Sequence, residues 1–224
     1  MLDSPRVLLW PRVVPRWHWS ADWCTPRRVF EARRALAPVV DPERLRDGAR
    51  DGVVFVFDTP TTTFLRHVAP VLLDEAVPFA VSVTTALVRT RTPRRARADA
   101  VSVTWNELAA LAEAGVTLAV RSHDVDDVAH LPDELAFGQL ATARMELRRR
   151  IGVDAWLVCD PSTASRPEVA RMAREMGFEV GLVRSSSTPL ARVDPLRTPA
   201  LVPRPWQPIA SIARRFAERA RAVG

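Results

Sequence analysis

The sequence predicts a single domain of the α/β class, built on a parallel sheet. Short apolar runs typical of strands alternate along the chain with longer amphipathic segments typical of helices, as in successive βαβ units. Several of the strand-like runs are apolar without alternation, which is typical of strands covered on both faces. A chain of 224 residues is long enough for one domain with a sizeable core.

The strand-like and helix-like segments follow one another in a regular order. Strands are predicted at residues 7–10, 53–57, 79–83, 117–120, 155–158 and 179–183, with a weaker one at 200–202. Helices are predicted at residues 25–36, 41–47, 63–76, 104–115, 135–150, 165–177 and 207–223.

Capping residues mark several of these helix ends. Thr25 precedes a proline at the first helical position, and Thr104 and Glu107 form a capping box. Gly152 and Gly177 are stop signals. With no repeat or linker in the sequence, we expect one domain over residues 1–224. It comprises an N-terminal strand and helices (1–50), a barrel core (51–204) and a C-terminal helix (205–224).

Composition and charge exclude several functions. The 32 basic residues are all arginine and are spread along the chain, and their densest stretch, residues 89–97, has no interleaved aromatic residues. No apolar run approaches the roughly 20 residues that span a bilayer, and the N-terminus is a poor signal peptide. Cys24 and Cys159 form no metal-type cluster. We expect a cytoplasmic protein that binds neither nucleic acid nor a membrane.

Polar residues follow the predicted strands at the points where the strands end. They are Asp58 and Thr59, Thr84 and Thr85, His123 and Asp124 (after Arg121 and Ser122), Cys159 and Asp160, and Arg184 and Ser185. Active sites of barrel folds are built from residues at the carboxyl ends of the strands. We therefore expect these side chains to converge on one mouth.

Within this group, His123 and Asp127 are four residues apart, a spacing found in paired metal ligands. Asp58 then supplies either a third ligand or a general base. The alternative is that Asp58 and His123 only cap neighbouring loops or helices.

The order of motifs resembles that of the NodB-type polysaccharide deacetylases, carbohydrate esterase family 4. VVFVFDTP resembles the family's strand ending in T-F-D-D-G, and WNELAALAEAGVTLAVRSHDVDDVAHL resembles the block that leads into H-[ST]-x-x-H. DPLRTPALVPR is similar to the D-P-x-R-L-P-R-I ending of a bacterial subgroup. The resemblance spans about residues 7–204 and implies a distorted (β/α)7 TIM-like barrel.

The resemblance also implies a divalent metal, zinc foremost, which activates water to remove acetyl groups from N-acetylated sugars. Asp58 matches the family's catalytic base, and His123 matches its first histidine ligand. Thr59 stands where the family has a metal-binding Asp, and Asp127 replaces the second histidine. Cys159 and Asp160 fall in the third motif, and Asp124 adjoins the second.

These departures from the family pattern leave two possible functions. The chain is either a metal-dependent hydrolase acting on an N-acylated sugar or small amide, or a catalytically degenerate barrel that binds a carbohydrate or a protein partner. A metal held by His123, Asp127 and Asp58 is chemically reasonable, but Asp124, Asp126 or Asp160 must then act as base. No L-x-H segment supplies the family's acid histidine.

Overall fold

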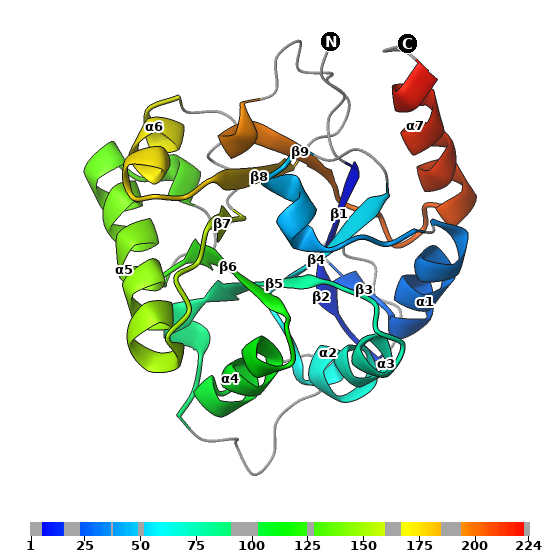
Figure 1. The fold of residues 1–224 in the computed structure, drawn as a ribbon, viewed down its shortest axis with the longest axis horizontal. Helices are drawn as coiled ribbons and strands as arrows, with labels where there is room; N and C mark the ends of the chain where they lie inside the picture. The colour runs from blue at the N-terminus through cyan, green and yellow to red at the C-terminus, as the bar shows by residue number, and fades with distance from the viewer. Residues whose placement is uncertain are drawn as a thin grey trace.

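A computed structural model shows seven parallel strands closed into a barrel and surrounded by helices (Figure 1). The structure describes residues 6–15, 23–36, 38–48, 52–90, 103–124, 128–159, 167–184 and 194–221. Around the barrel the strands are β1 (Arg6–Trp10), β4 (Val53–Asp58), β5 (Ala80–Thr84), β6 (Thr117–Ser122), β7 (Leu157–Val158), β8 (Val180–Arg184) and β9 (Thr198–Leu201). β9 pairs with β1 and closes the ring.

This architecture confirms the predicted α/β class and the (β/α)7 barrel, and each predicted strand is present. β6 continues two residues beyond its predicted end, so that Arg121 and Ser122 belong to the strand. A separate pair of two-residue strands, β2 (Arg12–Val13) and β3 (Trp23–Cys24), was not predicted.

Alternation along each strand divides the buried side chains into two groups. One cluster joins residues from all seven barrel strands and contains Val7, Leu9, Val54, Val56, Ala80, Ala119, Leu157, Val180, Leu182 and Ala200. Their neighbours in sequence, such as Phe55 and Leu118, belong to a second cluster that includes helix residues. The first cluster therefore fills the barrel, and the second lies between the strands and the helices.

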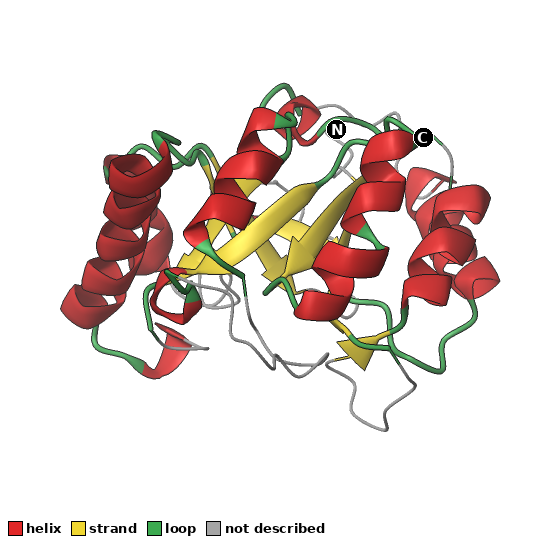
Figure 2. Ribbon diagram, turned by 90° about the horizontal axis from the view of Figure 1, so that it is seen from below, coloured by secondary structure: helices red, strands yellow, loops and turns green. Residues whose placement is uncertain are grey.

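The helices form the outer layer (Figures 1 and 2). They are α1 (Pro26–Ala35), α2 (Thr62–His67), α3 (Ala69–Asp74), α4 (Trp105–Glu113), α5 (Asp133–Ile151), α6 (Pro167–Glu175) and α7 (Ile209–Arg221). Short 3-10 turns are η1 (Pro42–Leu45), η2 (Thr85–Leu87), η3 (Val128–His130) and η5 (Pro195–Arg197). In Figure 1, α7 lies beside α1 at one edge of the barrel, and α5 packs with α6 at another.

The predicted helix over residues 63–76 is wrong in one respect, because the structure divides it into α2 and α3 at Val68. Pro70 has no backbone N–H and its ring clashes with the carbonyl four residues earlier, which kinks or breaks a helix at this point. By contrast, the capping box of Thr104 and Glu107 is confirmed, with both reciprocal hydrogen bonds present.

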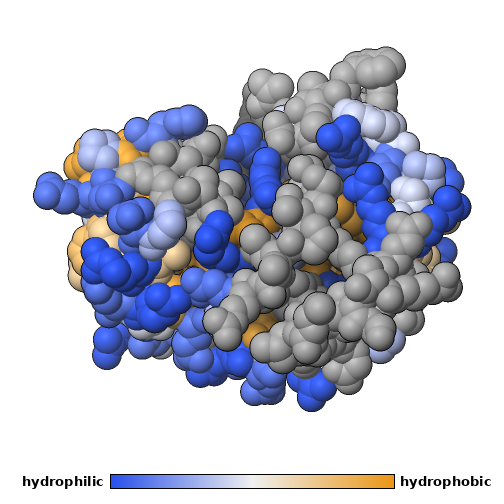
Figure 3. Space-filling view, turned by 90° about the horizontal axis from the view of Figure 1, so that it is seen from above, coloured by the Kyte–Doolittle hydropathy of each residue, from blue (hydrophilic) through white to orange (hydrophobic). Residues whose placement is uncertain are grey.

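The described residues on the face drawn in Figure 3 are mostly polar. Figure 3 shows one face on which apolar side chains are confined to small patches between hydrophilic ones. Among the helices that the structure describes, none combines the length and the apolar character needed to cross a membrane.

α3 ends in an unfavourable backbone conformation at Ala76. Ala76 has φ of 50°, in the left-handed region that favours glycine. The N–H of Val77 bonds the carbonyl of Leu72 at 2.8 Å and the N–H of Ala76 bonds that of Leu73 at 3.0 Å, the pattern of a Schellman motif. Both hydrogen bonds of the motif are therefore present, but its left-handed position is occupied by alanine, whose Cβ disfavours that conformation.

We predict that Ala76→Gly raises the free energy of unfolding by about 0.5–1 kcal/mol. Relief of the left-handed conformation gains about 1–2 kcal/mol, which outweighs the added freedom of the unfolded chain. Ala114, at the end of α4 with φ of −78°, is the matched control, and Ala114→Gly should lower stability. Urea denaturation measures both, and a less stable Ala76→Gly variant would contradict the explanation.

Candidate functional site at the barrel mouth

The inward-facing positions at the carboxyl ends of the strands carry polar side chains. Extending the inward alternation of five strands by one step, or by two in β5, leads to Asp58 in β4, Ser82 and Thr84 in β5, Arg121 in β6, Cys159 after β7 and Arg184 in β8. Because the strands are parallel and Asp58 is in register with Ser82, these positions lie at the same end of the barrel. This end is called the mouth below.

Asp58 is the centre of the hydrogen-bond network in the mouth. It is 6% exposed, and its Oδ1 accepts hydrogen bonds from Ser82 Oγ at 2.8 Å and Thr59 Oγ1 at 3.3 Å. Its Oδ2 accepts a hydrogen bond from Arg121 Nη1 and lies 3.5 Å from Arg184 Nη2. Both oxygens of this buried carboxylate are therefore engaged by donors, two of which are cationic.

Arg121 reaches Asp58 from an irregular part of β6. Val83 pairs with Val120, but the next residue of β5, Thr84, pairs with Ser122, so β6 has one extra residue at Arg121. A bulge of this kind redirects a side chain locally. The Arg121 side chain is 12% exposed, and its Nη1 also lies 3.4 Å from Thr59 Oγ1. One guanidinium nitrogen thus contacts both Asp58 and Thr59.

Thr59 forms the turn that follows β4, in a conformation unusual for its residue type. Its φ is 56°, and its N–H bonds the carbonyl of Ser82 at 3.2 Å. A β-branched residue is an outlier in this left-handed region, where Asp and Asn are the best tolerated residues after glycine. The backbone at this position therefore suits an Asp better than the Thr that occupies it.

His123 lies at the rim of the mouth and is held from several sides. Its Nδ1 is 2.9 Å from Thr85 Oγ1, and its carbonyl accepts a hydrogen bond from the N–H of Ala86. Gln139 of α5 accepts hydrogen bonds from the backbone N–H groups of His123 (3.2 Å) and Asp124 (2.9 Å). Asp124 is exposed. The turn is thus anchored both to η2 and to α5.

The remaining predicted residues have different environments. Cys159 is buried, and its N–H bonds the carbonyl of Val120 at 2.7 Å. Cys24 lies in the core below the helices, where burial raises the pKa of its thiol to about 12, so it stays protonated and unreactive. Asp127 and Asp160 lie outside the described residues, as does Asp126.

Several contacts of the mouth were not assigned a role from the sequence. Arg121, Thr85 and Arg184 were recognised only as residues near strand ends, and Ser82 and Gln139 were missed. Ser82 had a usable signal, because it lies two residues before Thr84 in an otherwise apolar strand and therefore on the same face. Gln139 had none, since a polar residue in a helix is ordinarily solvated.

The described residues do not fit a divalent metal ion. Within this part of the chain no three His, Cys, Asp or Glu side chains are grouped to hold one. Thr59 is a neutral ligand, His123 provides a single imidazole, and Asp58 is already paired with the guanidinium groups of Arg121 and Arg184. Among the described residues, the mouth therefore contains no ligand set for a divalent metal ion.

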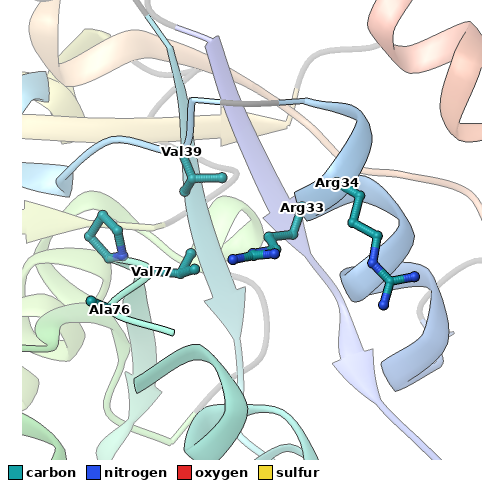
Figure 4. Close-up of a pocket in the computed structure, with 6 residues that line it drawn as sticks. Arg33, Arg34, Val39, Ala76 and Val77 are labelled. Carbon is teal, nitrogen blue, oxygen red and sulfur yellow. The ribbon is translucent and has the colours of Figure 1, made fainter. Parts of the chain in front are cut away.

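A cavity of about 440 Å³ lies at the other end of the barrel (Figure 4). It is lined by Arg33, Arg34, Val39, Ala76, Val77 and Pro78. Val39 pairs with the first residue of β4, and Pro78 lies just before β5, which places the cavity at the amino ends of the strands. In Figure 4, Arg33 extends toward Val77 whereas Arg34 points away. This cavity is separate from the mouth.

The fold is a closed parallel (β/α)7 barrel, and charged residues lie at the carboxyl ends of its strands. The model of the family described as polysaccharide deacetylase matches residues 46–181, more than half of the chain. The chain therefore belongs to the polysaccharide deacetylase family, whose members are generally metal-dependent. The curated proteins include no sequence that matches it.

Solved structures of deacetylases share the fold at low sequence identity. The Streptococcus pyogenes deacetylase PplD, in complex with acetate, is 11% identical with a TM-score of 0.80, covering 96% of this chain and 99% of its own. A de-N-acetylase from Aggregatibacter actinomycetemcomitans is 14% identical with a TM-score of 0.74, covering 96% and 100%. The BpsB deacetylase domain of Bordetella bronchiseptica is 19% identical with a TM-score of 0.68, covering 89% and 95%.

We predict that Asp58→Asn lowers the free energy of unfolding by about 3 kcal/mol, because it leaves two guanidinium groups without their buried counter-charge. The matched control is Glu31→Gln, which removes an ion pair with Arg27 whose side chains are 87% (Arg27) and 41% (Glu31) exposed. That change should cost no more than about 0.5 kcal/mol. Equal effects of the two variants in chemical denaturation would show that the pairs of Asp58 are not structural.

Proposed function

We propose that this polysaccharide-deacetylase barrel binds a carbohydrate in its mouth without metal-dependent hydrolysis. One contact carries the proposal: Arg121 Nη1 lies within hydrogen-bonding distance of both Asp58 and Thr59. In the family, these two positions supply the base and a metal ligand. A permanent protein cation thus stands beside the groups that an active member uses around its metal.

The charge of Arg121 opposes a second cation at the same place. Two unit positive charges about 4 Å apart repel each other by about 4 kcal/mol at an effective dielectric constant of about 20, and a divalent ion doubles that cost. The substitution at position 59 also removes the negative charge that would offset it. The repulsion by Arg121 and the loss of a carboxylate at position 59 both disfavour a divalent metal ion in the mouth.

The mouth nevertheless offers polar groups to a sugar. Arg184 is 36% exposed, and an arginine side chain has five N–H donors that suit carbonyl and hydroxyl oxygens. His123 and Thr85 add further polar groups at the rim. The acetate complex of the Streptococcus pyogenes relative supports an acyl group as one part of the ligand. An N-acetylated sugar is therefore the ligand that we propose.

Metal-dependent removal of an acyl group from an N-acylated sugar or small amide is the second candidate. The contact between Thr85 Oγ1 and His123 Nδ1 favours it, because histidine ligands of metals commonly use their other ring nitrogen in such a bond. This contact leaves Nε2 of His123 as the nitrogen for a ligand. Zinc binding distinguishes the two functions.

We predict that the wild-type protein binds no stoichiometric zinc. Thr59→Asp combined with Arg121→Ala should bind zinc with micromolar or better affinity, because it restores a carboxylate and removes the opposing cation. The matched control is Thr59→Asn with Arg121→Ala, which gives the turn the same backbone preference without the charge and should stay metal-free. Elemental analysis and calorimetric zinc titration measure all three.

Binding measurements on the wild-type protein test whether an N-acetylated sugar is the ligand. Wild-type protein should bind N-acetylglucosamine oligomers with a Kd that a chelator leaves unchanged, and it should release no acetate. Stoichiometric zinc in the wild type that is lost on His123→Ala would overturn the proposal. Chelator-sensitive acetate release that is abolished by Asp58→Asn would establish the hydrolase instead.

A further inference from the structure

A rigid turn presents an exposed tryptophan between β9 and α7. The N–H of Gln207 bonds the carbonyl of Arg204 at 3.0 Å, which closes a β-turn with Trp206 at its third position. Pro203 and Pro205 are buried and fix the backbone on either side of Arg204. The turn is thus defined by both packing and hydrogen bonding.

Arg28 in the first turn of α1 anchors this turn to the barrel. Its Nη2 donates hydrogen bonds to the carbonyl of Gln207 and, at 3.3 Å, to that of Arg204. Partial burial of the guanidinium lowers the pKa of Arg28, so this cation bears a desolvation cost at the place where it holds the turn. The backbone that carries Trp206 is therefore immobilised by a long-range contact.

The indole itself gains little from this rigidity within the protein. Trp206 is 56% exposed, and among the described tryptophans it alone belongs to the exposed class. Its ring lies beside Arg204, whose guanidinium carbon is 6.0 Å from the ring centroid. The exposed part of the ring contributes no burial energy to the fold, and it leaves an aromatic face open to an external partner.

The position of the turn relates it to the mouth. It follows the carboxyl end of β9, and the carboxyl ends of the parallel strands are all at the mouth. Ala200 of β9 is in register with Arg184, which contacts Asp58, and the six residue-to-residue steps from Ala200 to Trp206 reach at most about 22 Å. A chain of sugars lying in the mouth can therefore extend to this turn.

We propose that Trp206 forms a subsite that stacks on a sugar ring of a glycan chain occupying the mouth, with Arg204 donating to its hydroxyl groups. The inference rests on the proposed carbohydrate-binding function. An indole face matches the apolar C–H face of a sugar ring, and an adjacent guanidinium matches its equatorial oxygens. A single ring flanked by an arginine is too small for a stable protein interface, which buries about 800 Å² on each partner.

The test compares calorimetric binding of the hexamer and the dimer of N-acetylglucosamine to the full-length protein. Trp206→Ala should weaken hexamer binding about fivefold to tenfold and leave dimer binding unchanged, because the dimer occupies only the mouth. Trp206→Phe retains an aromatic face and should lose less than threefold. Phe137→Ala is the matched control, since Phe137 is 39% exposed on α5 and should have no effect.

Each outcome has a distinct meaning. Equal hexamer affinity of wild type and Trp206→Ala would overturn the subsite while leaving binding in the mouth intact. Absence of any glycan binding by the wild type would overturn both the subsite and the proposed function. Unchanged hexamer binding combined with loss of a protein captured by the wild type would assign Trp206 to a protein interface and would also overturn the subsite.

Discussion

The buried ion pairs of Asp58 determine what the rest of the mouth can do. Arg121 from β6 and Arg184 from β8 both converge on the carboxylate at the end of β4. Asp58 and Arg121 are largely removed from water, which costs several kcal/mol per ion, and that cost is offset only while the two remain together, whereas Arg184 pairs with Asp58 from the exposed side. The three strand ends are therefore linked electrostatically across the mouth, and the carboxylate of Asp58 is held by the protein's own cations.

The barrel could be predicted from the sequence because its strands and helices are set by local signals and by the periodic spacing of apolar residues. Apolar runs such as residues 53–57 and 117–120 are covered on both faces, and the capping box at Thr104 sets a helix start independently of its surroundings. Pro70 was a sequence signal for the division at Val68. The continuous apolar pattern across residues 63–76 nevertheless predicted a single helix. Strand-end position likewise indicated Asp58 and His123 as residues of one mouth.

The network around Asp58 could not be predicted, because it depends on register. Arg121 reaches the carboxylate where a bulge adds a residue to β6, and a bulge has no signature in the apolar pattern. Gln139 holds the His123 turn from a helix that begins ten residues later in the chain, so only the packed barrel shows the contact. These features place a protein cation, Arg121, beside Asp58 and Thr59 in the mouth.

The most direct test of this account is a crystal structure grown with excess zinc, with anomalous data collected at the zinc absorption edge. The account predicts no anomalous peak in the mouth, with the guanidinium of Arg121 in hydrogen-bonding contact with both Asp58 and Thr59. A zinc peak bound by Asp58 and His123, with Arg121 displaced from the carboxylate, would contradict it.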